Sequence, residues 1–301
     1  MSLPIDTLAE LVAPLSIDDF RAMFAAREPH HVPGDTTRAE RHADLFDWNL
    51  LVSGVRDGTF PAADLQLSRD RSKLPRMLLS KDPGERGDLV ERLLAANASV
   101  IVNCVQATVP ALGKLCEAVA KETQDHVSAV AIATSGQGGA LKIHYDEYDI
   151  IVLQVEGAKQ WSVYGDPVVN PVYGLNCKID QERLAPALEV VLKPGDWLYV
   201  PAGWAHCCDT ASARSLHLGI MFYPFNAVRA VELVMDSMLA DAHNRAPIRF
   251  DKADAAVTEA ALRNLLVSRI EAMPIDELLR LHQAGPDPRL THGGGARAAQ
   301  G

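Results

Sequence analysis

The sequence predicts a mainly β protein with flanking helices, whose central part is a double-stranded β-helix, or jelly roll. Three observations support this prediction. Between residues 98 and 223, short segments rich in apolar, β-branched and aromatic residues follow one another closely. Gly, Pro and Asp residues separate these segments, as in sandwiches and barrels that are built from short strands. Before and after this part, apolar residues recur at the spacing of amphipathic helices.

Residues 1–97 are expected to form a helical and mixed segment that packs on the core. Ser16 is a candidate N-cap, because it directly precedes a helical sequence with an acidic first turn. Further short helices are expected near residues 38–55 and 87–96. The basic stretch from Arg69 to Lys73 is interpreted as a solvated loop, which could alternatively guide a substrate.

The jelly roll itself is predicted over residues 98–223. Its expected strands have the sequences SVIVNCV, VSAVAIAT, DIIVLQV, KQWSVYG, LEVVLKPGDWLYVP, AHCCDT and RSLHLGIMFY, and VPALGKLCEAVAKETQD is expected to be a helix. Glu156 and Gly157 are expected to turn the chain, so that Lys159 lies on the returning strand of a hairpin.

Residues 224–284 are predicted to be helical again. In the first of these helices, apolar residues gather near one face: Val228, Val231, Met235 and Met238. Residues 285–301 are rich in Gly, Pro and Ala and are expected to be disordered.

Composition and charge narrow the classes of function. The chain has 301 residues and a net charge of −10, which argues against nucleic acid as the main partner, because phosphates attract basic surfaces. No apolar run approaches the roughly 18 residues that a membrane span requires, and the N-terminus does not resemble a signal peptide. The five cysteines include no C-x-x-C pair, which is typical of a reduced, cytoplasmic protein.

Three side chains suggest a metal centre. His144 and Asp146 are separated by one residue, so on an extended strand they face the same side. His206 follows a Gly-Trp turn at the start of a later strand. Two histidines and one carboxylate form a facial triad, which leaves three positions open on a non-haem Fe(II). An H-x-D pair alone is a weak signal, and a closed set of four ligands would suit structural zinc instead.

Lys159 needs a separate explanation, because it is flanked by apolar residues. A buried ammonium group is costly unless it is paired. A bound dicarboxylate would supply the partner through a charge-assisted contact. The alternative is a lysine whose end reaches water along an apolar surface.

Two longer motifs connect these residues: HYDEYDIIVLQVEGAKQW, which begins at His144, and LKPGDWLYVPAGWAH, which ends at His206. Together they resemble the JmjC-type Fe(II)/2-oxoglutarate oxygenases, and most of all the cupin-fold ribosomal-oxygenase branch, whose members hydroxylate protein side chains. In that family a basic residue follows the first ligand by 15 positions and a distal histidine follows it by about 60. Here Lys159 follows by 15 positions and His206 by 62, and the resemblance covers roughly residues 14–223.

The resemblance implies that His144, Asp146 and His206 hold Fe(II) and that Lys159 pairs with the distal carboxylate of 2-oxoglutarate. It also implies a hydroxyl or amide donor from the strand before the H-x-D motif, for which Thr134 and Ser135 are the candidates. Many relatives have an asparagine earlier on that strand, where this chain is apolar.

Other polar residues near the motifs are expected to have ordinary roles. Tyr145 and Glu147 are interpreted as packing or surface residues, and Tyr145 could also line a neighbouring pocket. His217 is interpreted as a core histidine.

The expected function is hydroxylation of an amino-acid side chain in a protein or peptide, with O2 as oxidant and with succinate and CO2 as co-products. N-methyl demethylation and hydroxylation of a free amino acid are open alternatives. Two rivals are a non-catalytic cupin-like binding module and a cupin isomerase or dioxygenase that uses no 2-oxoglutarate. The resemblance further implies that the C-terminal helices could mediate a homodimer.

Overall fold

The computed structural model of the protein describes residues 4–136, 138–172, 175, 177–239, 241–247 and 255–285. The chain divides into two compact units, which are described separately below. The first comprises Met1–Thr123 and Val127–Tyr223, and the second comprises Gln124–His126 and Pro224–Gly301. Almost all of the tail predicted to be disordered, residues 286–301, lies outside the described residues.

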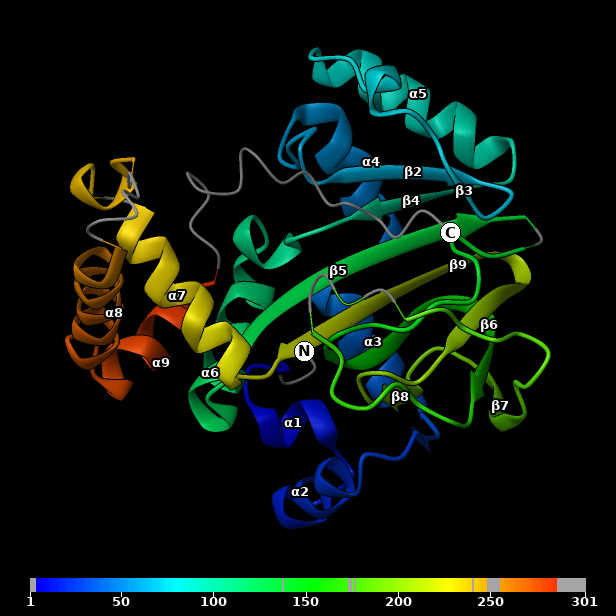
Figure 1. Cartoon of the computed structure of the whole chain (residues 1–301). Helices are drawn as coiled ribbons and strands as arrows, with labels where there is room; N and C mark the ends of the chain where they lie inside the picture. Colours follow the sequence, from blue (N-terminus) through cyan, green and yellow to red (C-terminus); the bar gives the residue numbers. More distant parts are fainter. Residues whose placement is uncertain are drawn as a thin grey trace. The chain divides into compact units, whose positions relative to one another are not determined.

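Within the described residues, nine strands form one antiparallel sheet (Figure 1). They are β1 (His30–Val32), β2 (Leu65–Arg69), β3 (Ser72–Lys73), β4 (Ala98–Val102), β5 (His126–Ser135), β6 (Asp149–Tyr164), β7 (Pro186–Leu192), β8 (Trp197–Val200) and β9 (His206–Tyr223). The order across the sheet is β1-β8-β6-β9-β5-β4-β2-β3, and β7 pairs with β6 outside this path.

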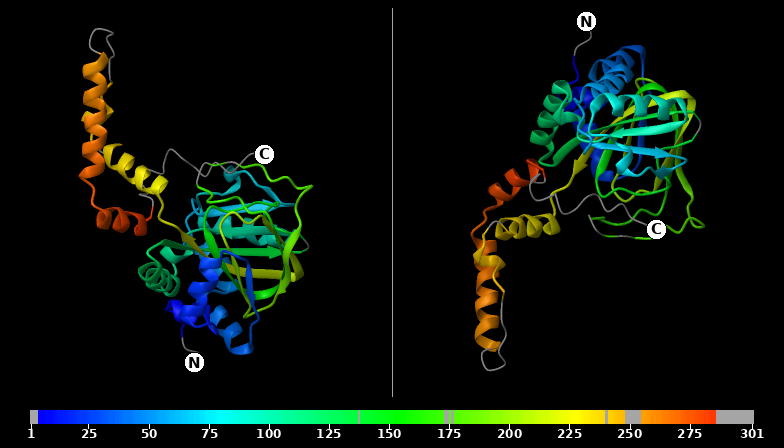
Figure 2. Two further views of the ribbon diagram at one scale, coloured as in Figure 1. Left: turned by 60° about the horizontal axis from the view of Figure 1, so that its bottom comes forward. Right: turned by 90° about the horizontal axis from the view of Figure 1, so that it is seen from above.

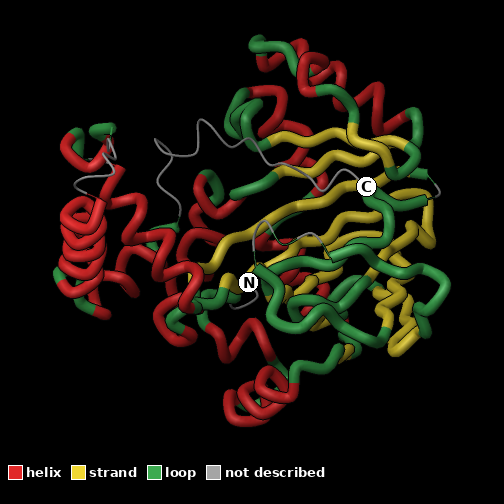
Figure 3. Tube along the Cα trace, viewed as in Figure 1, coloured by secondary structure: helices red, strands yellow, loops and turns green. Residues whose placement is uncertain are grey.

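The two longest strands, β6 and β9, make this sheet a jelly roll. The first half of β6 pairs with β8 and the second half pairs with β7, while β9 runs beside β6 over both halves. β6 thus has a different neighbour on one edge in each of its halves, and the sheet curves around an interior, as Figure 2 shows. The predicted fold class is confirmed: a mainly β core with flanking helices, as in Figure 3.

The predicted turn at Glu156 and Gly157 is wrong. β6 continues through these residues, and the pairing with β9 shifts register on both sides of them. Gly157 has a φ of 66°, and a Cβ atom there would lie 1.9 Å from the carbonyl oxygen of Arg214. A glycine of this kind marks a β-bulge as readily as a turn. The two strands predicted within residues 205–223 are likewise one strand, β9, which pairs with β6 on both sides of these register shifts.

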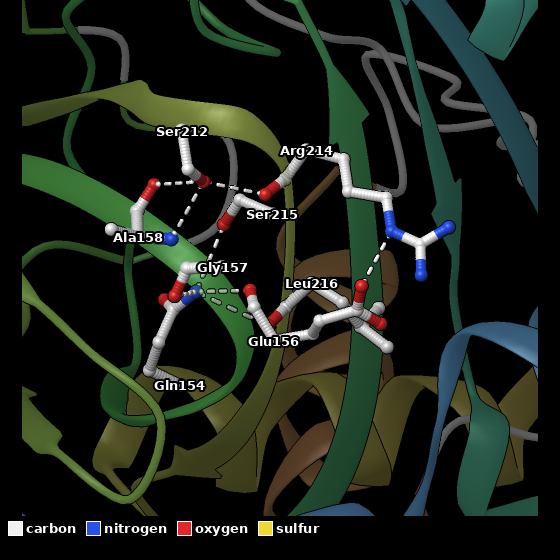
Figure 4. A network of polar contacts seen from close by, with 8 residues as sticks. All are labelled: Gln154, Glu156, Gly157, Ala158, Ser212, Arg214, Ser215 and Leu216. Carbon is white, nitrogen blue, oxygen red and sulfur yellow. Dashed lines mark hydrogen bonds and ion pairs between the residues drawn. The ribbon is translucent and has the colours of Figure 1, made fainter.

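Side chains hold this bend in place (Figure 4). The amide nitrogen of Gln154 donates to the backbone oxygen of Glu156 at 2.8 Å and to the hydroxyl of Ser215 at 2.9 Å. The guanidinium of Arg214 pairs with the Glu156 carboxylate. The hydroxyl of Ser212 accepts a hydrogen bond from the backbone of the neighbouring strand. The bend therefore has a fixed geometry.

Helices of the first unit cover one side of the sheet. They are α1 (Leu8–Val12), α2 (Ile17–Ala26), α3 (Thr36–Leu45), α4 (Trp48–Asp57), α5 (Pro83–Ala95) and α6 (Pro110–Thr123), with short 3-10 helices η1 (Arg76–Leu78) and η2 (Val105–Ala107). The predicted cap is confirmed, because the Ser16 hydroxyl accepts from the backbone N–H of Asp19 at 3.1 Å. The predicted N-terminal segment also supplies β1, β2 and β3 to the sheet and belongs to the same compact unit as the core.

Alternate residues of the strands enter two apolar cores. Ile151 and Leu153 pack in a core shared with the helices, whereas Ile150 and Val152 pack inside the roll. The inner core also contains Trp161. This alternation is what a strand with both faces buried requires.

The second unit contains α7 (Ala227–Leu239), η3 (His243–Arg245), α8 (Ala255–Glu271) and α9 (Ile275–Gln283). The predicted apolar face of α7 is only partly buried. Three residues of the predicted face, Val228, Val231 and Met235, are between 47% and 57% exposed, whereas Met238 is half-buried. Leu239, which was not predicted to belong to this face, is 49% exposed. Among the described residues, no helix is both long and apolar enough to cross a membrane.

Candidate metal centre

His144 and His206 lie opposite each other on adjacent backbone segments. The N–H of His144 donates to the oxygen of His206 at 3.1 Å, and the N–H of His206 donates to the oxygen of His144 at 2.7 Å. Directly opposed residues on an antiparallel pair point to the same face. The centroids of the two imidazole rings are accordingly 4.4 Å apart.

Asp146 joins this pair from the same segment as His144. Its Oδ1 lies 3.9 Å from Nε2 of His144, and its Oδ2 lies 3.6 Å from Nε2 of His206. One ligand atom from each residue lies within 4.8 Å of the other two. The backbone oxygen of Asp146 accepts from Gly203 at 2.9 Å, which fixes the segment beside the turn that precedes β9. The structure thus brings the three predicted ligands together.

Backbone carbonyls orient both rings. Nδ1 of His144 lies 2.8 Å from the oxygen of Lys142, and Nδ1 of His206 lies 2.9 Å from the oxygen of Trp204. A carbonyl only accepts hydrogen bonds, so each Nδ1 carries a proton and Nε2 is the nitrogen available to a metal. Metal-binding histidines normally have such a partner on the nitrogen that does not bind the metal.

The candidate metal centre is buried at His206 and accessible to solvent at His144. The His206 side chain is 5% exposed and stacks against Trp161 at 5.8 Å, whereas the His144 side chain is 33% exposed. Burial and the neighbouring His144 lower the pKa of His206 to about 4. His206 is therefore neutral near pH 7, which is the form that binds a metal.

Lys159 is fully buried, at 0% exposure, behind this centre. Its Nζ lies 3.3 Å from the hydroxyl of Thr134 and 3.4 Å from Nδ1 of His217. Burial lowers the pKa of Lys159. Within the described residues no carboxylate forms an ion pair with it, and the nearby Asp209 is paired with Arg71 instead.

Two further polar groups face the same space without a partner. Thr210 is the register partner of Lys159 on β9, and Trp161 follows Lys159 by two residues, so all three face one side. The hydroxyl of Thr210 and the indole N–H of Trp161 are buried and lack a hydrogen-bond partner within the described residues. Such groups are rare in native structures and indicate a ligand or water.

The structure separates the two predicted hydroxyl donors. Thr134 reaches Lys159, but the Ser135 hydroxyl donates to the backbone oxygen of Leu94 on the other side of β5. Neighbouring residues of a strand face opposite sides, so Ser135 cannot join Thr134 at Lys159. The prediction for Ser135 is corrected accordingly. His217, which was predicted to be a core histidine, is buried but contacts Lys159.

The hairpin of β2 and β3, at the edge of the sheet, holds the segment that carries His144 and Asp146. Arg71, in the turn between β2 and β3, donates to the backbone oxygen of Leu141 at 3.1 Å and pairs with Asp209 of β9. The hydroxyl of Ser68 donates to the backbone oxygen of Ala140 at 2.8 Å. The basic stretch at residues 69–73 is mostly exposed, as the solvated-loop interpretation expects, and Arg71 is the exception that ties this turn to the segment before β6.

Tyr145 connects the same segment to the loop between β6 and β7. Its hydroxyl donates to the backbone oxygen of Leu175 at 2.7 Å and accepts from the N–H of Cys177 at 2.9 Å. The interpretation of Tyr145 as a plain packing residue is therefore incomplete.

A jelly roll with an open His-Asp-His face and a buried lysine behind it defines a cupin-fold protein with a candidate metal centre. Residues 104–229 match the JmjC domain family. These residues are thus similar to a JmjC domain, and a longer part of the chain is similar to ribosomal oxygenases.

Ribosomal oxygenase 2 of Mus musculus is 25% identical over 227 residues, which cover 74% of this chain and 49% of that protein. The bifunctional lysine-specific demethylase and histidyl-hydroxylase NO66 of Drosophila pseudoobscura pseudoobscura is 33% identical over 233 residues, which cover 72% of this chain and 23% of that protein. The chain thus spans at most about half the length of these curated relatives.

Among solved structures, the ribosomal oxygenase YcfD from Escherichia coli, in complex with cobalt and 2-oxoglutarate, superposes with a TM-score of 0.58. It is 19% identical, and the match covers 85% of this chain and 67% of that chain. At this identity the similarity establishes the fold.

Proposed function

We propose that the protein is an Fe(II)- and 2-oxoglutarate-dependent oxygenase that hydroxylates an amino-acid side chain in a protein or peptide. The observation that carries this proposal is the fully buried Lys159, which has no carboxylate partner within the described residues and lies behind an open His-Asp-His face. A buried ammonium group is stabilised by an anion, and a dicarboxylate co-substrate supplies one.

The residues of the candidate centre fit this co-substrate and metal. His144, Asp146 and His206 would hold Fe(II) through two imidazole nitrogens and one carboxylate oxygen, and would leave positions for other ligands. Bound Fe(II) would supply the activation of O2 and the coupled conversion of 2-oxoglutarate to succinate and CO2.

The chain's own side chains would orient the co-substrate. Lys159 would pair with its distal carboxylate, and the Thr134 hydroxyl would hold the ammonium group in place. The unpartnered hydroxyl of Thr210 and indole N–H of Trp161 are further donors in the same space. Apolar residues of the inner core, such as Leu192, exclude bulk water from this end of the pocket.

A protein or peptide substrate is supported by the names of the relatives. Two of them are a ribosomal oxygenase and a lysine-specific demethylase and histidyl-hydroxylase. The second name keeps N-methyl demethylation as an alternative reaction of the same centre. Hydroxylation of a free amino acid and a non-catalytic binding role are the remaining alternatives.

We further propose a homodimer through the second unit and a cytoplasmic location. The exposed apolar face of α7, formed by Val228, Val231, Met235 and Leu239, supports self-association. All five cysteines are free thiols, which supports a reducing compartment. Sedimentation analysis of the protein beside Met235→Glu would test the dimer, since a charge on this face should yield monomers.

The function is tested by anaerobic titration with Fe(II) and then 2-oxoglutarate, observed through the visible metal-to-ligand charge-transfer band. The band should appear in the wild-type protein, vanish in His144→Ala and require much more 2-oxoglutarate in Lys159→Ala. Lys178→Ala, which changes an exposed lysine, is the matched control. Bound iron without a band would refute 2-oxoglutarate binding and would favour another cupin chemistry or a binding role.

A further inference from the structure

Lys159 and His217 bring two basic groups together in a sealed part of the roll. They are 0% and 2% exposed, and their nitrogen atoms Nζ and Nδ1 are 3.4 Å apart. Lys159 lies on β6 and His217 on β9, the two strands that run through both halves of the fold. The contact is therefore fixed by backbone pairing and not by a flexible loop.

Chemistry decides which group donates in this contact. An ammonium group has only donors, so Nδ1 of His217 must accept from Lys159, and the imidazole is then neutral with its proton on Nε2. Burial and the charge of Lys159 both hold the pKa of His217 well below its usual range. Burial also lowers the pKa of Lys159. In the empty pocket His217 is therefore the member of the pair that lacks its second proton.

The other groups that face the pair supply no free negative charge that would favour protonation of His217. Thr134 of β5 and Trp161 of β6 contact it and carry no charge. On β9, the thiol of Cys208 is buried with its pKa raised, so it is neutral near pH 7. The charge of Asp209 raises the pKa of Lys159, but this carboxylate is already paired with Arg71.

We propose that Lys159 and His217 form a proton-linked recognition site, in which binding of the distal carboxylate of the oxo-acid co-substrate draws a proton from solvent into the pair. The proposal rests on the proposed function of the same pocket. A carboxylate that pairs with Nζ of Lys159 lies within about 4–6 Å of His217, a distance at which an anion favours the protonated form of a neighbouring base. His217 is then a binding and specificity residue, not inert core.

The sign of the pH dependence follows directly. The free protein holds fewer protons on the pair than the complex does, so complex formation consumes protons and the affinity for 2-oxoglutarate rises as pH falls. No covalent step is involved. The reaction is protein plus dianion plus one proton from solvent, giving the complex.

The test is isothermal titration of the full-length, Mn(II)-loaded protein with 2-oxoglutarate, in buffers of different ionisation enthalpy at one pH. Mn(II) keeps the metal ligands deprotonated throughout and does not turn over. We expect net proton uptake in the wild-type protein and a smaller uptake in His217→Gln, which keeps a polar side chain but does not titrate. His243→Gln, an exposed histidine in the second unit, should behave as the wild type does.

Three outcomes are distinguishable. No heat of 2-oxoglutarate binding in a protein that binds Mn(II) would overturn the proposed function itself. Binding with equal proton uptake in wild type and His217→Gln would leave the function intact and overturn this inference. If His217→Gln does not fold, the wild-type affinity between about pH 6 and about pH 8 still decides, because a flat profile overturns the inference.

Discussion

His144 and His206 exchange two backbone hydrogen bonds, of 3.1 and 2.7 Å, across an isolated rung between the segment before β6 and the start of β9. The two imidazoles of the candidate metal centre are thus placed by the main chain. Each ring is then oriented by a carbonyl two residues earlier in its own segment. Neither step depends on a metal, so the chain should fold with the centre preformed.

Loss of one imidazole should abolish tight metal binding without unfolding the protein. His206→Ala is expected to weaken Mn(II) or Fe(II) binding by more than about 100-fold, since loss of outer partners alone costs 10–100-fold. Chelator treatment of the wild type should leave the far-ultraviolet circular dichroism spectrum unchanged, because the apolar cores do not include the triad. Wild-type affinity in the variant would contradict the assignment, and His243→Gln serves as the control.

Replacement of Lys159 should separate stability from co-substrate binding. Lys159→Met removes a buried, uncompensated charge, so the Tm is expected to stay equal or to rise. The same variant should lose about 2 kcal/mol of 2-oxoglutarate binding, or about 30-fold in affinity, which is the usual value of a charged hydrogen bond. Thermal unfolding and titration measure the two effects, with Lys178→Met as control. Unchanged affinity would exclude Lys159 as the anchor.

The sequence predicted the parts of this site that depend on local spacing. His144 and Asp146 are two residues apart, and their convergence follows from strand geometry alone. The pairing of His206 with His144 depends on contacts over 62 positions, and it was predictable only through the resemblance to known oxygenases.

The sequence could not reveal the roles of His217 and Thr210, because their relation to Lys159 is set by the register of β6 on β9. That register shifts at the bulge around Gly157. A single glycine in a strand pattern does not distinguish a bulge from a turn, and this ambiguity produced the wrong hairpin. Ser135 failed for a simpler reason, since adjacent strand residues face opposite sides.

The contacts of Arg71 with Leu141 and Asp209 should affect metal binding more than they affect the free energy of unfolding. The Arg71 and Asp209 side chains are partly exposed, so Arg71→Ala should change the free energy of unfolding by only about 0–1 kcal/mol. Loosening the segment that carries His144 and Asp146 should still weaken Mn(II) binding by about 10-fold. Hydrogen exchange of residues 138–146 and Mn(II) titration check this. Arg69→Ala, on the same hairpin, should show neither effect.

Among the glycines of β6 and β9, Gly157 should be the one whose replacement by alanine lowers the free energy of unfolding most. In Gly157→Ala the new methyl group would meet the Arg214 carbonyl at 1.9 Å in a backbone with positive φ, so we expect a loss of more than about 3 kcal/mol. Gly138→Ala also has positive φ but open space around its Cβ, and about 1 kcal/mol is expected. Urea unfolding compares the two. Equal losses would show that backbone strain alone, and not the contact with β9, is responsible.

His42 should make the first unit acid-sensitive. Nδ1 of this buried histidine lies 3.0 Å from the backbone oxygen of Gln154, and burial lowers its pKa from 6.5 to about 4. The unfolded chain therefore binds the extra proton between these two values, so stability is complete above pH 6.5 and is lost as pH falls toward 4. The loss should reach about 3 kcal/mol. Urea unfolding at several pH values should show a shallower decline in His42→Gln, and identical slopes would refute the assignment.

The pairing of β6 with β9 fixes the spacing between the two ends of the pocket. Val163 lies opposite His206 and Lys159 lies opposite Thr210, with no register shift between these rungs. The backbone positions of His206 and Lys159 are therefore four residue pairs apart, about 13 Å along the strands. A lysine on the same face could move only in steps of two residues, or about 6.6 Å, far coarser than one methylene group. For the proposed diacid ligand, the backbone thus sets the accepted length only in coarse steps, and finer discrimination must come from the side chains around Lys159.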